Sequence, residues 1–127
     1  MRRRLGHLGT ANSNGLPHVV PVCFALADNA IYTPIDEKPK GGNVLKRLKN
    51  ISDNPQAAFL ADRYDEDWSL LGWVLADGRA DIVDGGSEQD AAQALLRARY
   101  RQYASMRLSP VIAIRIRRVR SWGNLDG

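Results

Sequence analysis

Strand-forming runs separated by turn residues fill the first third of the chain. Three such runs are present: residues 7–12, 17–26 and 30–35. The dipeptide Asn14-Gly15 between the first two is the strongest short-range signal for a hairpin. Pro21 lies inside the second run and has no backbone N–H to donate, so this strand is expected at a sheet edge or bulged near its middle. The chain therefore begins as antiparallel β structure.

The middle of the chain changes to a helical pattern. Apolar residues at helical spacing between 44 and 51 predict a helix, with Asn43 as its N-cap and Asn54-Pro55 after its end. Residues 56–62 then have the composition of a buried strand.

A second helix is predicted in the last third. Ser87 is followed three residues later by Asp90, which resembles a capping box. Apolar residues then line one helical face: Ala92, Leu95, Leu96, Tyr100 and Tyr103.

Two further regions have strand patterns. Residues 68–76 and 79–83 are strand-like, and Asp77-Gly78 between them suits either a tight turn or a bulge within one long bent strand. Residues 111–120 alternate, with isoleucines facing one way and arginines the other. This alternation predicts a half-buried last strand.

These elements together define a fold class. About six or seven strands and two helices occur in one chain without repeats, low-complexity stretches or linkers. The pattern predicts a mainly β fold with flanking helices, a small antiparallel β-barrel with helices packed outside it. Residues 1–127 are expected to form a single domain.

Composition narrows the class of protein. The chain has 127 residues, of which 44% are hydrophobic, and no apolar run approaches the roughly 20 residues that cross a bilayer. The single Cys23 cannot form an internal disulfide, and two histidines with one cysteine cannot form a zinc site of ordinary spacing. Because the first residues contain no apolar signal-peptide core, we expect a cytoplasmic protein.

An excess of basic residues favours anionic ligands. The chain carries 18 Lys and Arg against 14 Asp and Glu, and residues 97–120 contain eight arginines and no acid. A nucleic-acid site is one interpretation of this run. Against it, no aromatic residues interleave the last arginines, and alternation spreads them over both strand faces. A solvated strand face is the simpler interpretation.

One segment concentrates groups that bind anions. A strand containing Tyr32-Thr33 is followed by Lys38, Lys40 and a Gly-Gly pair where the first helix begins. A hydroxyl, two ammonium groups and free backbone N–H groups would lie close together there, and all of them stabilise phosphate oxygens. The segment predicts a phosphate cradle, with a solvated basic loop as the alternative.

A series of short motifs runs through nearly the whole chain in a fixed order. They are Leu8-Gly9-Thr10-Ala11, Gly15, Pro17, Pro21, Phe24, Tyr32-Thr33, Asp36, Lys38, Lys40, Leu45, Leu48, Asn50-Ile51, Asn54-Pro55-Gln56-Ala57, Asp65, Asp67-Trp68, Trp73-Val74, Ala76, Gly78 and Ala80. This series resembles the split-barrel flavin and deazaflavin oxidoreductases related to pyridoxamine phosphate oxidase. The Lys-Pro-Lys run followed by Asp-Trp resembles, within them, the probable coenzyme F-420-dependent subset.

The resemblance implies an FMN-binding split β-barrel that forms a homodimer, with the cofactor in a groove at the interface. The cofactor ring would lie against the second strand, bordered by Val20, Pro21 and Val22. The small-molecule substrate would bind against the ring.

The same resemblance implies a phosphate grip after the third strand. Thr33, Lys38 and Lys40 would hold the cofactor phosphate, and Tyr32 would support that wall. The resemblance also favours one bent strand through Gly78 over a hairpin there.

The implied activity is hydride transfer between a small organic substrate and a bound deazaflavin (coenzyme F-420) or FMN. The residues agree that a cofactor would perform the difficult step, because the sequence has no nucleophile elbow, Walker loop or dinucleotide fingerprint. Residues 121–127 lack the arginine-rich ending with which pyridoxamine phosphate oxidases recognise their substrate, so that activity is not expected. Two alternatives stay open: a nucleic-acid-binding module that uses the C-terminal arginines, and a flavin carrier without turnover.

Overall fold

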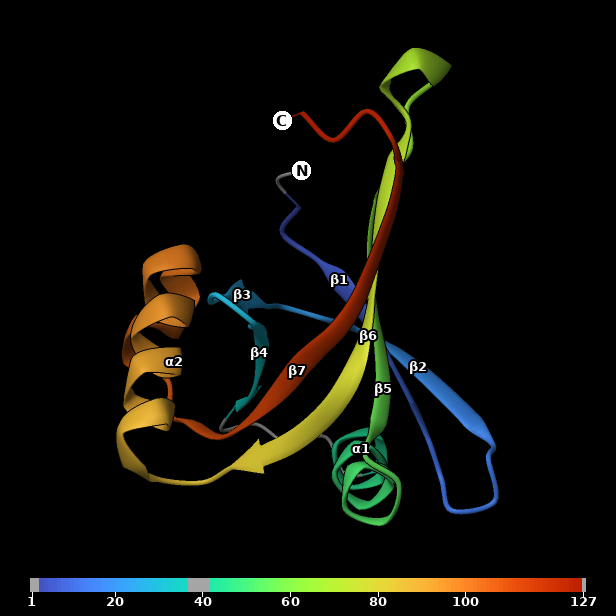
Figure 1. Cartoon of the computed structure of the whole chain (residues 1–127). Coiled ribbons are helices and arrows are strands. Elements are labelled where there is room, and N and C mark those ends of the chain that lie inside the picture. The colour runs from blue at the N-terminus through green and yellow to red at the C-terminus, as the bar shows by residue number, and fades with distance from the viewer. Residues whose placement is uncertain (1–2, 37–41, 127) are drawn as a thin grey trace.

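The structure is a computed structural model that describes residues 3–36 and 42–126, and this part of the chain forms a seven-stranded antiparallel sheet with two α-helices beside it (Figure 1). The elements in chain order are β1 (Gly6–Ala11), β2 (Pro17–Val22), β3 (Ala25–Leu26), β4 (Ala30–Asp36), α1 (Gly42–Asp53), β5 (Gln56–Arg63), the short 3-10 helix η1 (Trp68–Leu70), β6 (Gly72–Val83), α2 (Gly86–Arg99), the 3-10 helix η2 (Arg101–Ser105) and β7 (Leu108–Gly123). The strand order is β2-β1-β5-β6-β7-β4-β3. The predicted mainly β fold with flanking helices is confirmed.

The sheet curls so that strands near its two ends face one core. Val20 and Val22 of β2 pack in the same buried cluster as Ile31 and Ile35 of β4, although β2 and β4 lie far apart in the strand order. We call this cluster the barrel core; it consists of Leu8, Val20, Val22, Phe24, Ile31, Ile35, Ile51, Ala57, Phe59, Ala61, Ala76, Ala80, Ile112 and Ile114. The sheet therefore curls around one core as a barrel does, while β2 and β3 remain its two end strands.

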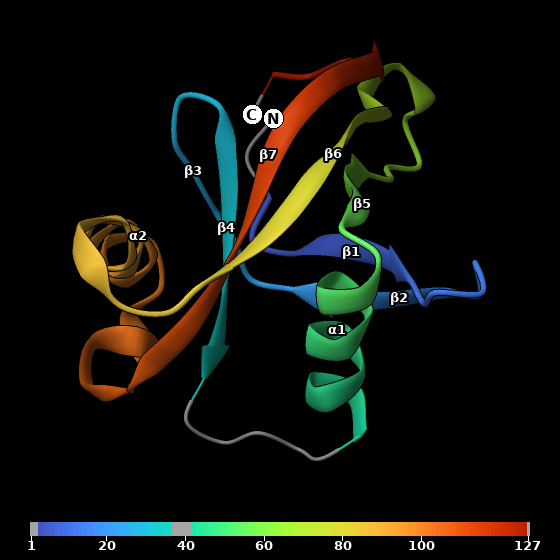
Figure 2. The same ribbon diagram turned by 60° about the horizontal axis from the view of Figure 1, so that its bottom comes forward.

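A second cluster lies on the other face of β4 and β7, under α2. This α2 core consists of Ala25, Ala30, Tyr32, Ala92, Leu96, Tyr100, Leu108, Val111 and Ala113. Figures 1 and 2 show α2 and α1 on different sides of β4 and β7. The first half of β7 is therefore buried on both faces, and the prediction of a half-buried strand is wrong there. The α2 helix covers the face of Val111 and Ala113, and alternation within a strand does not reveal such a cover.

β6 is one long strand with a bulge at Asp77/Gly78, where its register with β7 shifts. A Cβ atom on Gly78 would lie 1.9 Å from the carbonyl oxygen of Arg115, so the bend brings the two backbones too close for any side chain. The bulge is confirmed, and the tight turn that the residues alone also allowed does not form.

The segment before β6 differs from the prediction. Residues 68–70 form η1, not the start of a strand, because the Asp67 carboxylate accepts a hydrogen bond from the Ser69 backbone N–H (3.0 Å) and caps a helical turn. The strand itself begins at Gly72.

The N-terminal hairpin is present but its details differ from the prediction. The loop between β1 and β2 has five residues, and the Asn12 carboxamide oxygen accepts hydrogen bonds from the backbone N–H groups of Asn14 (2.9 Å) and Leu16 (3.0 Å). Gly15 supplies the positive φ of +83° that this loop needs. The predicted strand over 17–26 is interrupted after Val22, so β2 and β3 are separate elements.

Both helices begin differently from the prediction, and only α1 ends where predicted. α2 stops at Arg99, so Tyr100 and Tyr103, which were expected on its apolar face, lie at its C-cap and in η2. α1 begins at Gly42 rather than after Asn43, and it ends at Asp53, before Asn54. α2 follows Gly85, which has a φ of +96° and forms no side-chain cap, and Ser87 lies within the helix, so the predicted capping box is wrong. None of the helices in the described part of the chain is long and apolar enough to span a bilayer.

Candidate functional site

The three predicted ring contacts of β2 point to two different faces. Val20 and Val22 are buried in the barrel core, whereas Pro21 is exposed on the opposite face. Val19 shares that face with Pro21 and is 65% exposed. Val19 and Pro21 therefore present β2 side chains that a ring could contact from outside the barrel.

β2 also has a free edge, because it pairs only with β1 within the described sheet. Proline fits an edge strand where its nitrogen faces away from the neighbouring strand. The nitrogens of Pro17 and Pro21 both face away from β1 in this way. Val19 lies two residues from each of them, so its backbone groups face the same side of the strand. The Val19 backbone N–H therefore points to the free edge, between two residues that have no N–H.

Tyr32 and Thr33, which the sequence placed on one wall, face opposite sides of β4. Thr33 is 2% exposed and lies between Ile31 and Ile35, so it shares their barrel-core face. Tyr32 belongs to the α2 core. The structure thus brings Thr33 toward the interior that Val20 and Val22 line, and it separates Tyr32 from them.

The two lysines of the predicted phosphate grip, Lys38 and Lys40, lie outside the described residues. The described chain ends at Asp36 on one side of them and resumes with α1 at Gly42 on the other.

A charged network joins β4, β6, β7 and α2 next to Tyr32. The Tyr32 hydroxyl donates a hydrogen bond to Glu88 Oε2 (2.8 Å). Arg115 donates from Nη2 to Glu88 Oε1 (2.8 Å), from Nη1 to Glu88 Oε2, and from Nε to Asp81 Oδ2 (3.0 Å). This network fixes the first turn of α2 to the sheet.

The network shifts the pKa values of its members. Hydrogen bonding from Arg115 lowers the pKa of the Glu88 carboxyl to about 2, and the hydrogen bond from Tyr32 acts in the same direction. Burial, together with Glu88, raises the pKa of the Tyr32 hydroxyl. Glu88 therefore stays ionised and Tyr32 protonated at neutral pH, so neither is poised as an acid or base there.

Several arginines of β7 are paired with acids rather than presented to a ligand. Asp77 on β6 forms ion pairs with Arg118 (3.5 Å) and Arg120 (4.0 Å), and Arg115 is held by Asp81 and Glu88. The acids that neutralise them lie in elements distant in sequence, which is why the run over 97–120 looked unbalanced. This pairing argues against a nucleic-acid surface on β7.

The exposed side chains of β2 could contact the aromatic ring of a cofactor. Val19 and Pro21 offer an exposed apolar surface, and the Val19 N–H offers one donor at its edge. Sequence reasoning missed Val19, although its period-2 relation to Pro21 would have identified it. Within the described residues there is no group of three or more His, Cys, Asp or Glu that could hold a metal ion.

Comparison with known proteins identifies the family. Residues 2–123 match the model of the pyridoxamine 5'-phosphate oxidase family, and the chain belongs to that family. No curated protein matches the sequence.

Solved structures share the fold. A conserved hypothetical protein of Mycobacterium tuberculosis superposes with a TM-score of 0.73 at 22% identity, covering 95% of this chain and 78% of that one. The heme storage protein HutZ of Vibrio cholerae gives 0.73 at 15% identity, covering 96% and 87%. An FAD-binding protein of Mesorhizobium loti gives 0.67 at 24% identity, covering 94% and 85%. The predicted split-barrel family is confirmed.

Proposed function

We propose that this protein is an oxidoreductase that transfers a hydride between a small organic substrate and a bound deazaflavin, coenzyme F-420, or FMN. The observation that carries the proposal is the exposed apolar face of β2 around Val19 and Pro21, on a free sheet edge of a pyridoxamine 5'-phosphate oxidase family fold. The FAD-binding protein of Mesorhizobium loti, which shares this fold, supports a flavin-type cofactor.

In this proposal β2 holds the ring and β4 leads to the phosphate. Pro21 and Val19 would contact the ring from outside, and the Val19 N–H would donate to a ring carbonyl oxygen. Val20 and Val22 would fix the strand by packing in the barrel core. Lys38 and Lys40 would hold the phosphate. Thr33, buried on the barrel-core face, and Tyr32, anchored to Glu88 on the other face, would keep β4 in place.

When bound, the cofactor supplies the hydride chemistry. The protein's own residues exclude water with apolar side chains, orient the substrate, and present fixed hydrogen-bond donors to the ring. The described site residues need not transfer a proton.

We also propose a homodimer that closes the groove. Residues that pair in register across β2, β1, β5 and β6 share one outer face: Pro21, His7, Leu60 and Leu75 in one row, and Val19, Gly9, Ala58 and Asp77 in the next. All are exposed or half-buried in the single chain, and apolar side chains predominate. A second copy packed on this outer face would cover the ring and supply the rest of the substrate pocket.

Titration of the purified protein with coenzyme F-420, FMN and hemin, followed by fluorescence quenching or the Soret band, tests the proposal. We expect micromolar or tighter binding of one of the two flavin-type cofactors. The double variant K38Q/K40Q should weaken it about tenfold or more, because two charge-assisted contacts are lost. The matched control K46Q/K49Q removes the same charge from α1 and should change affinity less than about twofold.

Two results would count against the proposal. If the protein bound hemin but neither flavin-type cofactor, its cofactor would be a heme and the proposed flavin-type cofactor would be wrong. Stopped-flow oxidation of the bound reduced cofactor by candidate acceptors separates an enzyme from a carrier, and a rate no faster than that of the free cofactor would support the carrier.

A further inference from the structure

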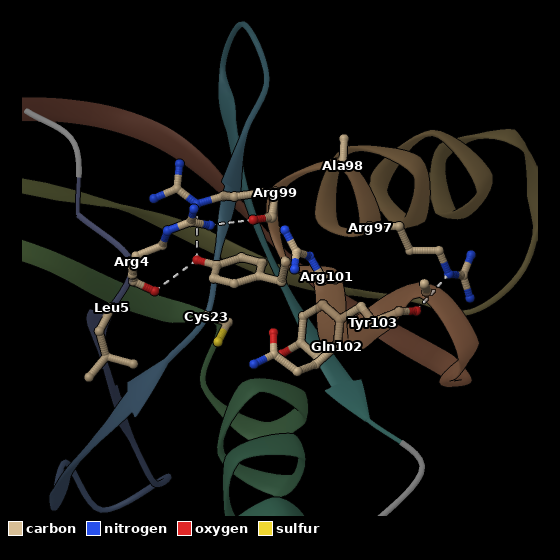
Figure 3. Close-up of a pocket in the computed structure, with 11 residues that line it drawn as sticks. Arg4, Leu5, Cys23, Arg97, Ala98, Arg99, Arg101, Gln102 and Tyr103 are labelled. Carbon is tan, nitrogen blue, oxygen red and sulfur yellow. Dashed lines mark hydrogen bonds between the residues drawn. The ribbon is translucent and has the colours of Figure 1, made fainter.

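One cavity among the described residues does not involve the outer face of β2. It is an open pocket of about 1050 Å³ between the N-terminal segment at Arg4, the β2–β3 link at Cys23, the end of α2 and η2 (Figure 3). This volume lies at the upper limit of the sites that bind small molecules.

The pocket lining is strongly basic. Four arginines line it, Arg4, Arg97, Arg99 and Arg101, and no lining residue is acidic. Within the described part of the chain, none of the four forms an ion pair with a carboxylate. This contrasts with β7, where Arg115, Arg118 and Arg120 each have an acidic partner.

One of the four arginines has a structural task. Arg97 donates from Nε to the Tyr103 carbonyl (3.1 Å) and from Nη2 to the Met106 carbonyl (2.9 Å), which holds η2 against α2. Figure 3 shows Arg97 turned toward η2, apart from Arg4 and Arg99. Arg4, Arg99 and Arg101 therefore remain as ligand-binding candidates.

Tyr100 forms a rigid base for two of these arginines. Its hydroxyl accepts hydrogen bonds from the Phe24 N–H (3.0 Å) and from Arg99 Nε (3.0 Å), and its proton can go to the carbonyl of Arg4 (2.9 Å) or of Phe24 (3.0 Å). The Arg99 guanidinium lies over the Phe24 ring, 4.6 Å from its centroid. Arg4 donates to the Arg99 carbonyl. These contacts use one N–H of Arg4 and one of Arg99, out of the five that each guanidinium carries.

We propose that this pocket binds an organic anion that carries a phosphate or carboxylate group on an apolar body. Guanidinium groups without acidic partners repel one another, and an oxyanion among Arg4, Arg99 and Arg101 would remove that repulsion while using their free donors. The side chains of Leu5, Cys23 and Tyr103 in the lining supply the apolar contact. The proposal is independent of the cofactor site, because none of the residues that would contact the cofactor there lines the pocket.

The test uses phenyl phosphate as the probe, with inorganic phosphate and benzyl alcohol as partial probes, in isothermal titration calorimetry at low ionic strength. We expect phenyl phosphate to bind more tightly than either, and the variant R101Q to weaken it about fivefold. R107Q is the matched control, since Arg107 is also exposed and lies in the same region but not in the pocket lining; it should change affinity less than about twofold.

A second variant addresses the geometry. R99K keeps the charge but loses the stacking on Phe24 and the planar fork, so it should weaken phenyl phosphate about threefold or more while the far-ultraviolet circular dichroism stays unchanged. If R101Q and R107Q reduced the affinity for phenyl phosphate equally, the proposal would be overturned, because the effect would then come from net charge and not from the pocket. Equal affinity for phenyl phosphate and benzyl alcohol would overturn it as well.

Discussion

Arg115 on β7 and Glu88 on α2 are joined by two parallel hydrogen bonds, with Nη2 2.8 Å from Oε1 and Nη1 bound to Oε2. This bidentate pair connects the first turn of α2 to a strand whose two faces are both covered nearby. Arg115 therefore has a structural role, although the excess of arginines in this part of the sequence would suggest that it binds an anionic ligand.

Removal of this pair should destabilise the fold. E88Q loses the charge in both contacts, and because Glu88 and Arg115 are each about a third exposed (35% and 39%), we expect a loss of about 1 kcal/mol in the free energy of unfolding. Urea denaturation at pH 7 measures it. E66Q, at an exposed loop position, is the control and should be neutral. A loss no greater than that of E66Q would contradict the assigned role.

The same pair predicts a pH dependence. The folded-state pKa of Glu88, about 2, lies below its ordinary value of 4.5, so the stabilisation is fully present above about pH 5 and is lost as the pH falls toward 2. The stability difference between the wild type and E88Q should therefore shrink between pH 5 and pH 3. Parallel urea titrations across that range give the answer, and a constant difference would show that Glu88 acts through packing alone.

Gly78 should be intolerant of any side chain. A Cβ atom on residue 78 would lie 1.9 Å from the carbonyl oxygen of Arg115. G78A should therefore lower the free energy of unfolding by about 3 kcal/mol or more, because β7 must move away from β6. G15A is the comparison, because Gly15 has a positive φ but open space around it and should cost about 1 kcal/mol. Thermal and urea unfolding of both variants distinguish steric overlap from backbone strain. If G78A and G15A lost similar amounts of stability, the close approach of the β6 and β7 backbones at Gly78 would be contradicted.

Val19 should matter for cofactor binding and assembly without being needed for folding. V19E places a charge on the proposed ring surface and should weaken the flavin-type cofactor about tenfold and shift size-exclusion elution toward the monomer. L26E is the matched control, because Leu26 is an exposed apolar residue of β3 and lies outside the proposed site. If V19E and L26E behave alike, the outer face is not the binding surface.

The nucleic-acid alternative makes its own prediction. Since Arg115, Arg118 and Arg120 are paired with acids, we expect only weak binding of a labelled single-stranded DNA oligonucleotide in fluorescence anisotropy. The variant R115Q/R117Q should leave that weak binding unchanged within about twofold. Tight binding with a steep salt dependence that this variant abolishes would favour the alternative.

Local patterns in the sequence were sufficient for much of the fold. The hairpin around Gly15, the helix ending before Asn54 and the isoleucines of β7 in the barrel core all follow from turn chemistry and periodicity. The bend at Gly78 was one of two possibilities that local chemistry allowed, and the resemblance to a known family selected it.

The parts that could not be predicted depend on contacts between distant segments. Nothing near Tyr32 in the sequence shows that α2 covers its face of β4, so Tyr32 and Thr33 seemed to share a wall. Likewise Glu88 and Arg115 are 27 residues apart, and only the packing of α2 brings them together. The arginine-lined pocket has the same origin, since Arg4 and Arg99 come from opposite ends of the chain.

The two prolines of β2 also limit how copies of this chain can associate. An open strand edge normally invites a further strand, and repeated addition leads to fibres and aggregates. Pro17 and Pro21 remove donors along that edge on either side of Val19, so a continuous ladder with another chain cannot form there. Edge-to-edge growth is therefore disfavoured along this edge, and the exposed face of the sheet remains for any contact between copies.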